Sequence, residues 1–121
     1  MSDEGERRRA RVPEDLSRFF VERANKGDVE GLVALYEPDA VLALPNGEVA
    51  AGTQAIREAY QVLLAERPAF TSGYQAPALV NGILALTSTL IPGGATAELA
   101  RRQPDGTWLW VMDRPNVLAS T

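Results

Sequence analysis

The chain has 121 residues, of which 45% are hydrophobic, and it carries a formal net charge of −4. A chain of this length is expected to form one domain with its own hydrophobic core. Cysteine and histidine are both absent, which excludes disulfides, thiolate nucleophiles, Ser-His-Asp triads and metal sites built on those ligands. The negative charge disfavours nucleic-acid binding, which depends on clustered positive charge.

The two ends of the chain are expected to lie outside the domain. Segment 1–12 mixes arginines with acids, which predicts a flexible, solvated arm. The domain is expected over 13–115 and a short tail over 116–121. No apolar stretch long enough for a membrane span or a secretory signal is found in the sequence, so we expect a cytoplasmic protein that binds no membrane.

Three helices are predicted before the main β region. Apolar residues recur at helical spacing over 13–25, 28–37 and 53–67, and each stretch ends at glycine or proline. Tyr36 is expected on the apolar face of the second helix, and Tyr60 on that of the third. A buried strand is expected between the second and third helices.

The second half of the chain reads as β structure. Turn residues at Pro77, Pro92–Gly94 and Pro104–Gly106 divide it into four segments. Helices followed by hairpin-connected strands are typical of an α+β domain with an antiparallel sheet, in the order ααβαββββ.

Several stretches of the first half carry a family resemblance: RFF at 18–20, NKGDVEGLVALY at 25–36, PDAV at 38–41 and GTQAIREAY at 52–60. These resemble the SnoaL-like and ketosteroid-isomerase-like proteins of the nuclear transport factor 2 fold. The resemblance implies a cystatin-like fold, in which a curved antiparallel sheet and three helices form a cone-shaped pocket for a small, mostly apolar molecule. It implies neither a metal nor another cofactor.

Carried over residue by residue, the resemblance implies that this chain lacks the main groups of steroid isomerisation. Leu44 stands where ketosteroid isomerases have the catalytic base, and Phe20 stands where they have the tyrosine of the oxyanion hole. Tyr36 and Tyr60 match positions of supporting tyrosines. Glu98 matches a second, protonated acid that donates a hydrogen bond to the oxyanion.

The acidic residues point to Glu98 independently of the family. Most of the others suit helix starts, turns, polar helix faces or the N-terminal arm. Glu48 follows a turn, Asp113 is expected at a strand end near the rim, and Glu98 is expected in mid-strand. Glu98 is therefore the candidate pocket acid, for which the resemblance implies the role of general acid or oxyanion donor; the alternative is a strand residue that is exposed, or salt-bridged to Arg101 or Arg102.

Counting from the last two turns predicts a register for the final hairpins. With loops at 91–94 and 103–106, Glu98 lies between Thr87 and Val111 on the pocket face. The opposite, convex face then carries Leu99, Trp108, Trp110 and Met112. A sheet face this apolar predicts a homodimer formed through those residues.

Two functions remain open on the sequence alone. The first is a cofactor-independent isomerase or cyclase, acting by acid/base chemistry on a ketone or polyketide-like apolar substrate. The second is a non-catalytic domain that binds a ligand or serves dimerisation. In the first, Glu98 is the catalytic residue and the substrate contacts are Phe20, Tyr36, Leu44, Tyr60, Thr87 and Val111.

Overall fold

A computed structural model describes residues 7–118, which form three helices and nine strands. The elements in chain order are α1 (Glu14–Asn25), α2 (Val29–Val33), β1 (Tyr36–Ala43), β2 (Val49–Ala51), α3 (Thr53–Ala65), β3 (Tyr74–Gln75), β4 (Leu79–Asn81), β5 (Leu84–Thr87), β6 (Thr89–Ile91), β7 (Gly94–Ala95), β8 (Ala97–Arg102) and β9 (Trp108–Arg114).

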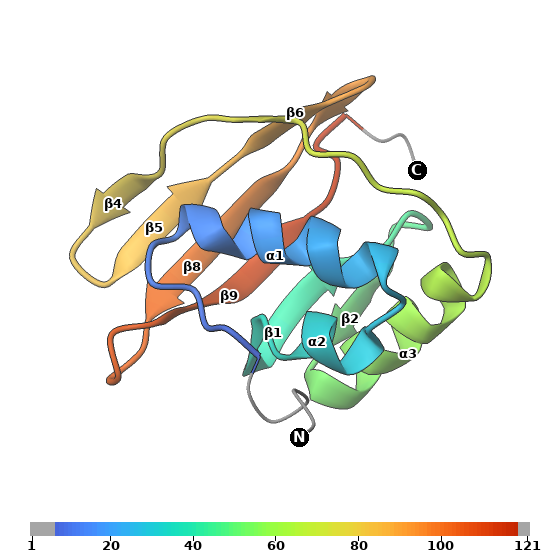
Figure 1. Cartoon of the computed structure of the whole chain (residues 1–121), viewed down its shortest axis with the longest axis horizontal. Coiled ribbons are helices and arrows are strands. Elements are labelled where there is room, and N and C mark those ends of the chain that lie inside the picture. Colours follow the sequence, from blue (N-terminus) through green and yellow to red (C-terminus); the bar gives the residue numbers. More distant parts are fainter. Residues whose placement is uncertain (1–6, 119–121) are drawn as a thin grey trace.

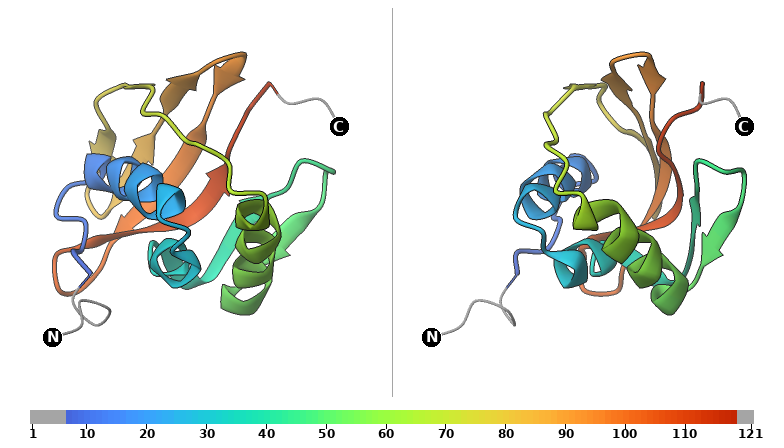
Figure 2. Two further views of the ribbon diagram at one scale, coloured as in Figure 1. Left: turned by 45° about the vertical axis from the view of Figure 1, so that its right-hand side comes forward. Right: turned by 90° about the vertical axis from the view of Figure 1, so that its right-hand side faces the viewer.

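The strands form a six-stranded sheet in the order β2-β1-β9-β8-β5-β4, with a small sheet β3-β6-β7 at one end. Every pairing is antiparallel except that of β1 with β9. The sheet curves, and all three helices lie on its concave side (Figures 1 and 2). The predicted α+β fold is confirmed, with a mixed sheet because of that single parallel pairing.

The helix ends follow from local chemistry. Glu14 and Asp15 occupy the first turn of α1, where negative charge favours the positive end of the helix dipole. Gly27 has a φ of 70°, a conformation that glycine adopts without strain. The next residue, Asp28, caps α2 by accepting a hydrogen bond from the Gly31 amide at 3.0 Å.

Tyr36 lies on a strand, so its predicted place on the second helix is wrong. Helix α2 ends at Val33, and the Trp110 amide donates to the Leu35 carbonyl at 2.8 Å. This bond begins the parallel ladder in which Tyr36 lies opposite Trp110. Pairing with β9 therefore overrides the helical periodicity of this short segment.

The β region after residue 69 contains more strands than the four that were predicted. The two long hairpin strands each bend, at Ser88 and at Thr96, and continue into the small sheet as β6 and β7. The predicted pairing of Thr87 with Glu98 is confirmed.

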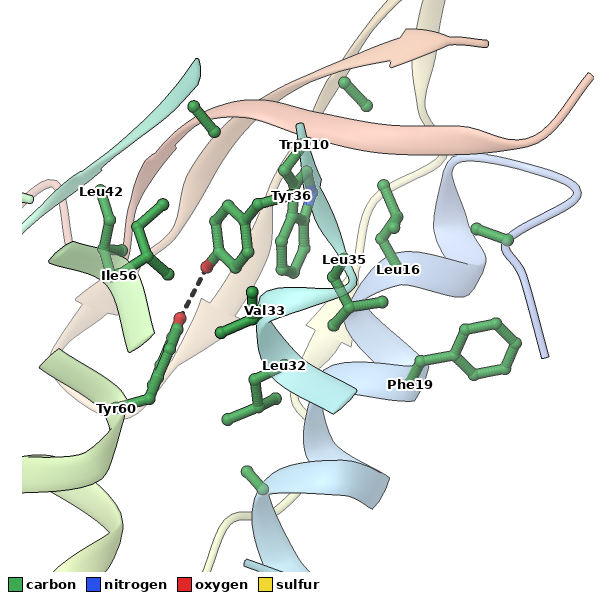
Figure 3. Packing of buried hydrophobic residues seen from close by; sticks show 14 of the residues in the cluster. Leu16, Phe19, Leu32, Val33, Leu35, Tyr36, Leu42, Ile56, Tyr60 and Trp110 are labelled. Atoms are coloured by element: carbon green, nitrogen blue, oxygen red, sulfur yellow. Dashed lines mark hydrogen bonds between the residues drawn. The ribbon is translucent and has the colours of Figure 1, made fainter. Parts of the chain in front are cut away.

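The core lies between the helices and the concave face of the sheet. Leu16, Leu32 and Ile56 are its most completely buried large side chains. Figure 3 shows the sheet residues Tyr36 and Trp110 between α1 and α3. Trp108 and Trp110 are both buried, so their predicted place on the convex face is wrong.

The register error has two physical causes. The turn between β8 and β9 is closed by a hydrogen bond from the Gln103 amide to the Thr107 carbonyl, which leaves one residue fewer in the loop than predicted. This places Ala100 opposite Trp110 and brings both tryptophans inward. A bulge between these strands shifts the register by one more residue, so that Glu98 pairs with Asp113 instead of the predicted Val111.

Two irregular segments pack against the domain. Ala10, within the segment expected to be a flexible arm, is buried and pairs with Trp108. The segment 66–78, here called the strap, runs along α1 (Figure 1). Asn25 holds the Phe70 backbone through two hydrogen bonds of 2.9 and 2.8 Å, and Glu14 accepts from the Ala78 amide.

Candidate functional site

Two carboxyl groups lie side by side on the concave face of the sheet. Glu98 on β8 pairs with Thr87 on β5 and with Asp113 on β9. The Thr87 hydroxyl donates to Glu98 Oε1 at 2.7 Å. Glu98 and Asp113 are only 6% and 8% exposed, and no salt bridge to either is found in the described part of the chain.

A chain of hydroxyl groups ends on Asp113. The Tyr36 hydroxyl donates to Asp113 Oδ2 at 2.5 Å, and it lies 2.6 Å from the Tyr60 hydroxyl. Because Tyr36 gives its one proton to Asp113, the proton between the two tyrosines comes from Tyr60. The bonds therefore run from Tyr60 on α3 to Tyr36 on β1 and then to Asp113 on β9; the contact between the tyrosines is drawn in Figure 3.

Both acids hold their protons more tightly than acids in water. Burial, followed by the nearby charge of Glu98, raises the pKa of Asp113 to about 7, against the opposing effect of the Tyr36 hydrogen bond. Burial also raises the pKa of Glu98, opposed by hydrogen bonds from Thr96 and Thr87. Near neutral pH the pair therefore holds a proton that it can exchange.

The tyrosines remain protonated donors. Burial raises the pKa of Tyr36 and of Tyr60 above the usual tyrosine range, and the negative charge of Asp113 adds to the effect at both. These hydroxyl groups can therefore orient and stabilise a carboxylate, whereas proton exchange near neutral pH belongs to the acids.

Aromatic rings pack beside the tyrosine that begins this chain of hydroxyl groups. Phe20 on α1 has its ring centroid 6.1 Å from that of Tyr60, 6.3 Å from that of Trp110 and 5.5 Å from that of Phe70 in the strap. The indole nitrogen of Trp110 is buried and has no hydrogen-bond partner among the described residues. This wall is apolar apart from that one donor.

The structure brings most of the predicted site residues together. Tyr36, Tyr60, Thr87 and Glu98 form one connected group with Asp113, and Phe20 packs on its aromatic side. Leu44 is half-buried beyond β1 and packs against the core. Val111 does not pair with Glu98, because the shorter turn and the bulge together shift the partner of Glu98 to Asp113.

Sequence reasoning missed Asp113, which was assigned to the rim. Trp108 and Trp110 alternate as residues on the inward face of a strand do. If this alternation continued, Met112 would be the next inward residue and Asp113 would lie on the outward face. The bulge reverses this, so Met112 is 51% exposed and Asp113 is buried. The signal for the inward tryptophans was available, whereas nothing in the local sequence marks the bulge.

The site contains no group of three or more potential metal ligands among residues 7–118. Two cavities of about 570 and 640 Å³ lie elsewhere, and neither is lined by Glu98, Asp113, Tyr36 or Tyr60. In the same part of the chain, every helix is too short or too polar to cross a membrane.

Comparisons with solved structures place the fold among known ones. A ketosteroid isomerase-like protein from Erwinia carotovora atroseptica matches with a TM-score of 0.68 and 20% identity, covering 88% of this chain and 94% of that one. A protein from Streptomyces avermitilis, named provisionally as a dehydratase of the nuclear transport factor 2-like family, matches with a TM-score of 0.64 and 18% identity, covering 88% and 94%.

A protein from Thiobacillus denitrificans, named provisionally as a calcium/calmodulin-dependent protein kinase type II association domain, has a TM-score of 0.71 and 13% identity, covering 90% and 98%. At such identities these neighbours show the fold alone. No curated protein sequence gives a significant match. The sequence profile of the SnoaL-like domain matches residues 17–114. This chain belongs to the SnoaL-like domain family.

Proposed function

We propose that the protein is a cofactor-independent enzyme that moves a proton on a small, mostly apolar carbonyl compound, as an isomerase or cyclase does. The observation that carries this proposal is the buried pair Glu98 and Asp113, which lies at the end of the tyrosine chain and has no ion-pair partner within residues 7–118. A pKa near the working pH is the property that an acid/base catalyst needs. Cytoplasmic location is part of the same proposal.

The two acids take different roles in this proposal. Asp113 is the base in the state in which the shared proton lies on Glu98, because the Asp113 carboxylate then accepts the hydrogen bond from Tyr36. Glu98, when it carries the proton that the pair shares, is the acid that donates to the carbonyl oxygen on which charge develops. Asp113 replaces Leu44 as the source of basic chemistry, and Glu98 keeps the role expected from the sequence.

The substrate must reach these acids past aromatic side chains. Phe20, which packs against Tyr60, meets Phe70 edge to face. Phe70 belongs to the strap, which Asn25 and Glu14 hold to α1. Movement of the strap is therefore the proposed route of entry. The buried Trp110 indole N–H has no hydrogen-bond partner among the described residues, which favours a ligand that carries an acceptor oxygen.

The test uses cyclic ketones as probes and follows exchange of their α-protons in heavy water by NMR. The unmodified protein is expected to accelerate exchange, and Asp113→Asn is expected to lose about a hundredfold or more of that acceleration. Glu98→Gln should retain ketone binding with slower exchange. Glu48→Gln, at an exposed turn, is the matched control and should exchange ketone protons like the unmodified protein.

A second candidate is a non-catalytic domain that only binds a ligand. It is favoured by Leu44 and Phe20 standing where the family's isomerases carry chemical groups, and by the closed packing around the acids. Ketone binding without exchange in the same experiment would establish this second function. Exchange that survives in both Asp113→Asn and Glu98→Gln would contradict the proposed roles of these acids.

Steroid isomerisation is not expected to be efficient. Leu44 cannot accept a proton and Phe20 cannot donate one to an oxyanion. Each of the missing groups supplies on the order of a hundredfold or more in rate. Turnover of a β,γ-unsaturated ketosteroid at about 10 per second, the median for enzymes, would show that Asp113 and Glu98 replace both groups.

We also propose that a second copy of this chain covers the convex face of the sheet. One apolar row crosses five strands there, through Leu79, Leu86, Leu99, Met112 and Val41. Leu86 and Met112 are each 51% exposed. Two-fold symmetry allows such a surface to pair with itself.

Light scattering tests the dimer. Met112→Arg is expected to give monomers, while Val62→Arg, at an exposed position on α3, should leave the dimer intact. Trp110→Arg should unfold the protein, because Trp110 belongs to the core. A monomeric parent protein at micromolar concentration would contradict the dimer.

A further inference from the structure

One of the two cavities described above is lined by positively charged side chains. It has a volume of about 570 Å³ and lies between the segment before α1, the α1 residue Arg23 and the turn that joins β8 to β9. Figure 1 shows the N-terminal segment passing near that turn, and an ion pair from Arg9 to Asp105 joins the two. Four arginines line it: Arg7, Arg8, Arg9 and Arg23.

Three of these arginines have carboxylate partners. The pairs are Arg7 with Asp28 at 2.7 Å, Arg8 with Glu22 at 3.1 Å and Arg9 with Asp105 at 2.8 Å. Arg23 is the member of this set that has no carboxylate within ion-pair distance among residues 7–118.

Arg23 is the most deeply buried member of the set. Its side chain is 6% exposed, and its guanidinium donates to the Gly31 carbonyl at 2.8 Å and to the Arg8 carbonyl at 2.6 Å. It also stacks on the Phe19 ring. Among the described residues no carboxylate lies within ion-pair distance of it.

The charge of Arg23 is therefore solvated mainly by carbonyl dipoles. Burial, followed by the positive charge of Arg7, lowers its pKa, and the acids Asp28 and Glu22 oppose this effect. A guanidinium group does not give up its proton in a protein. Since a buried charge without a partner is unfavourable, an anion in the adjoining cavity would remove the imbalance.

We propose that this cavity binds a small oxyanion, a phosphate or carboxylate group, with the Arg23 guanidinium as its central contact. Arg9, which also lines the cavity, is a further donor. Planar guanidinium groups suit such ligands because they offer paired N–H donors. The site is independent of the acid pair and of the enzymatic proposal.

Calorimetric titration of the full chain tests the site with inorganic phosphate in one arm and malonate in the other, at constant ionic strength set by sodium chloride. One binding event per chain is expected, and the tighter of the two anions identifies the chemical group. Arg23→Met is expected to weaken binding about tenfold or more. Arg9→Gln should weaken it by less, because Arg9 is exposed.

Arg57→Gln is the matched control, since Arg57 pairs with Glu30 on the surface and does not line the cavity. It should bind both anions like the parent protein. Absence of binding at millimolar anion, or an equal loss in all three variants, would overturn the proposal. If circular dichroism shows Arg23→Met to be unfolded, the double change Arg8→Gln and Arg9→Gln decides, and unchanged affinity there would also overturn it.

Discussion

The acid cluster and the arginine-lined cavity each bury ionisable side chains that have no ion-pair partner among the described residues. The two regions differ in how the buried charge is avoided or stabilised. Glu98 and Asp113 can neutralise themselves by binding a proton, and the pKa of each is raised accordingly. Arg23 cannot lose its proton at any ordinary pH. It therefore depends on carbonyl groups and, as proposed, on an anion.

This difference separates two kinds of candidate site. A buried acid pair without a cation gains an exchangeable proton near neutral pH, which suits proton-transfer chemistry. A buried arginine beside a cavity keeps its positive charge at every ordinary pH, which favours the binding of an anion. Substitutions in one region at a time should therefore differ in whether their effect on stability depends on pH.

The largest effect is expected from Asp113→Asn. The folded-state pKa of Asp113 is about 7, against an ordinary value of 3.8, so the protonated folded form is favoured at low pH. That stability is fully present below about pH 4 and is lost as the pH rises through about 7, a loss on the order of 4 kcal/mol. Relative to the parent, Asp113→Asn should therefore become more stable at pH 8 than at pH 4.5 in urea unfolding.

A matched control for that experiment has the opposite sign. Hydrogen bonds from Thr107, followed by the pairing with Arg9, lower the pKa of Asp105 against a small burial effect. Its stability contribution is present at high pH and lost as the pH falls. Asp105→Asn should therefore show no relative gain at pH 8. If Asp105→Asn gained as much relative stability at pH 8 as Asp113→Asn, burial would not explain the pH dependence of Asp113→Asn.

Arg23→Met should destabilise the protein by about 1–3 kcal/mol, because two carbonyl groups lose a charged donor. The loss should be the same at pH 5 and pH 8, since the guanidinium does not titrate in this range. Urea unfolding at the two pH values measures it. If the loss of stability in Arg23→Met varied with pH as strongly as the effect of Asp113→Asn, the claim that only the acid cluster titrates would be contradicted.

Tyr60→Phe is the mildest change. It removes the hydrogen bond from Tyr60 to Tyr36 and should cost about 1 kcal/mol of stability. Because Tyr36 then supports the Asp113 carboxylate less well, the pKa of Asp113 should rise. Tyr74→Phe, at an exposed position, is the control and should leave both stability and that pKa unchanged; a lower Asp113 pKa in Tyr60→Phe would contradict the direction assigned to the chain.

Much of the fold was predictable because its signals are local. Helical spacing and terminating residues indicated α1 and α3, and the turn at Pro92–Gly93 fixed the pairing of Thr87 with Glu98. The second half of the β region depended on counting through a turn. There the loss of one loop residue was enough to turn Trp108 and Trp110 from the predicted convex face to the core, whereas Met112, beyond the bulge, is exposed.

The unpredicted parts of both sites depend on contacts between distant segments. Asp113 enters the cluster through a bulge, and Tyr36 reaches it because pairing with β9 turns the end of the second helix into strand. Arg23 sits at an ordinary helix position, and only the chain before α1 makes it a cavity residue. Such arrangements are set by packing, which hydrophobic periodicity alone does not encode.

The central claim is that Asp113 is a buried acid that titrates near neutral pH. NMR with ¹³C-labelled aspartate carboxyl groups measures this directly, and Asp113→Asn assigns the signal by removing it. The account predicts a midpoint near 7 for Asp113. A midpoint near 4, the ordinary value for an aspartate, would contradict it and would leave the cluster a structural hydrogen-bond network.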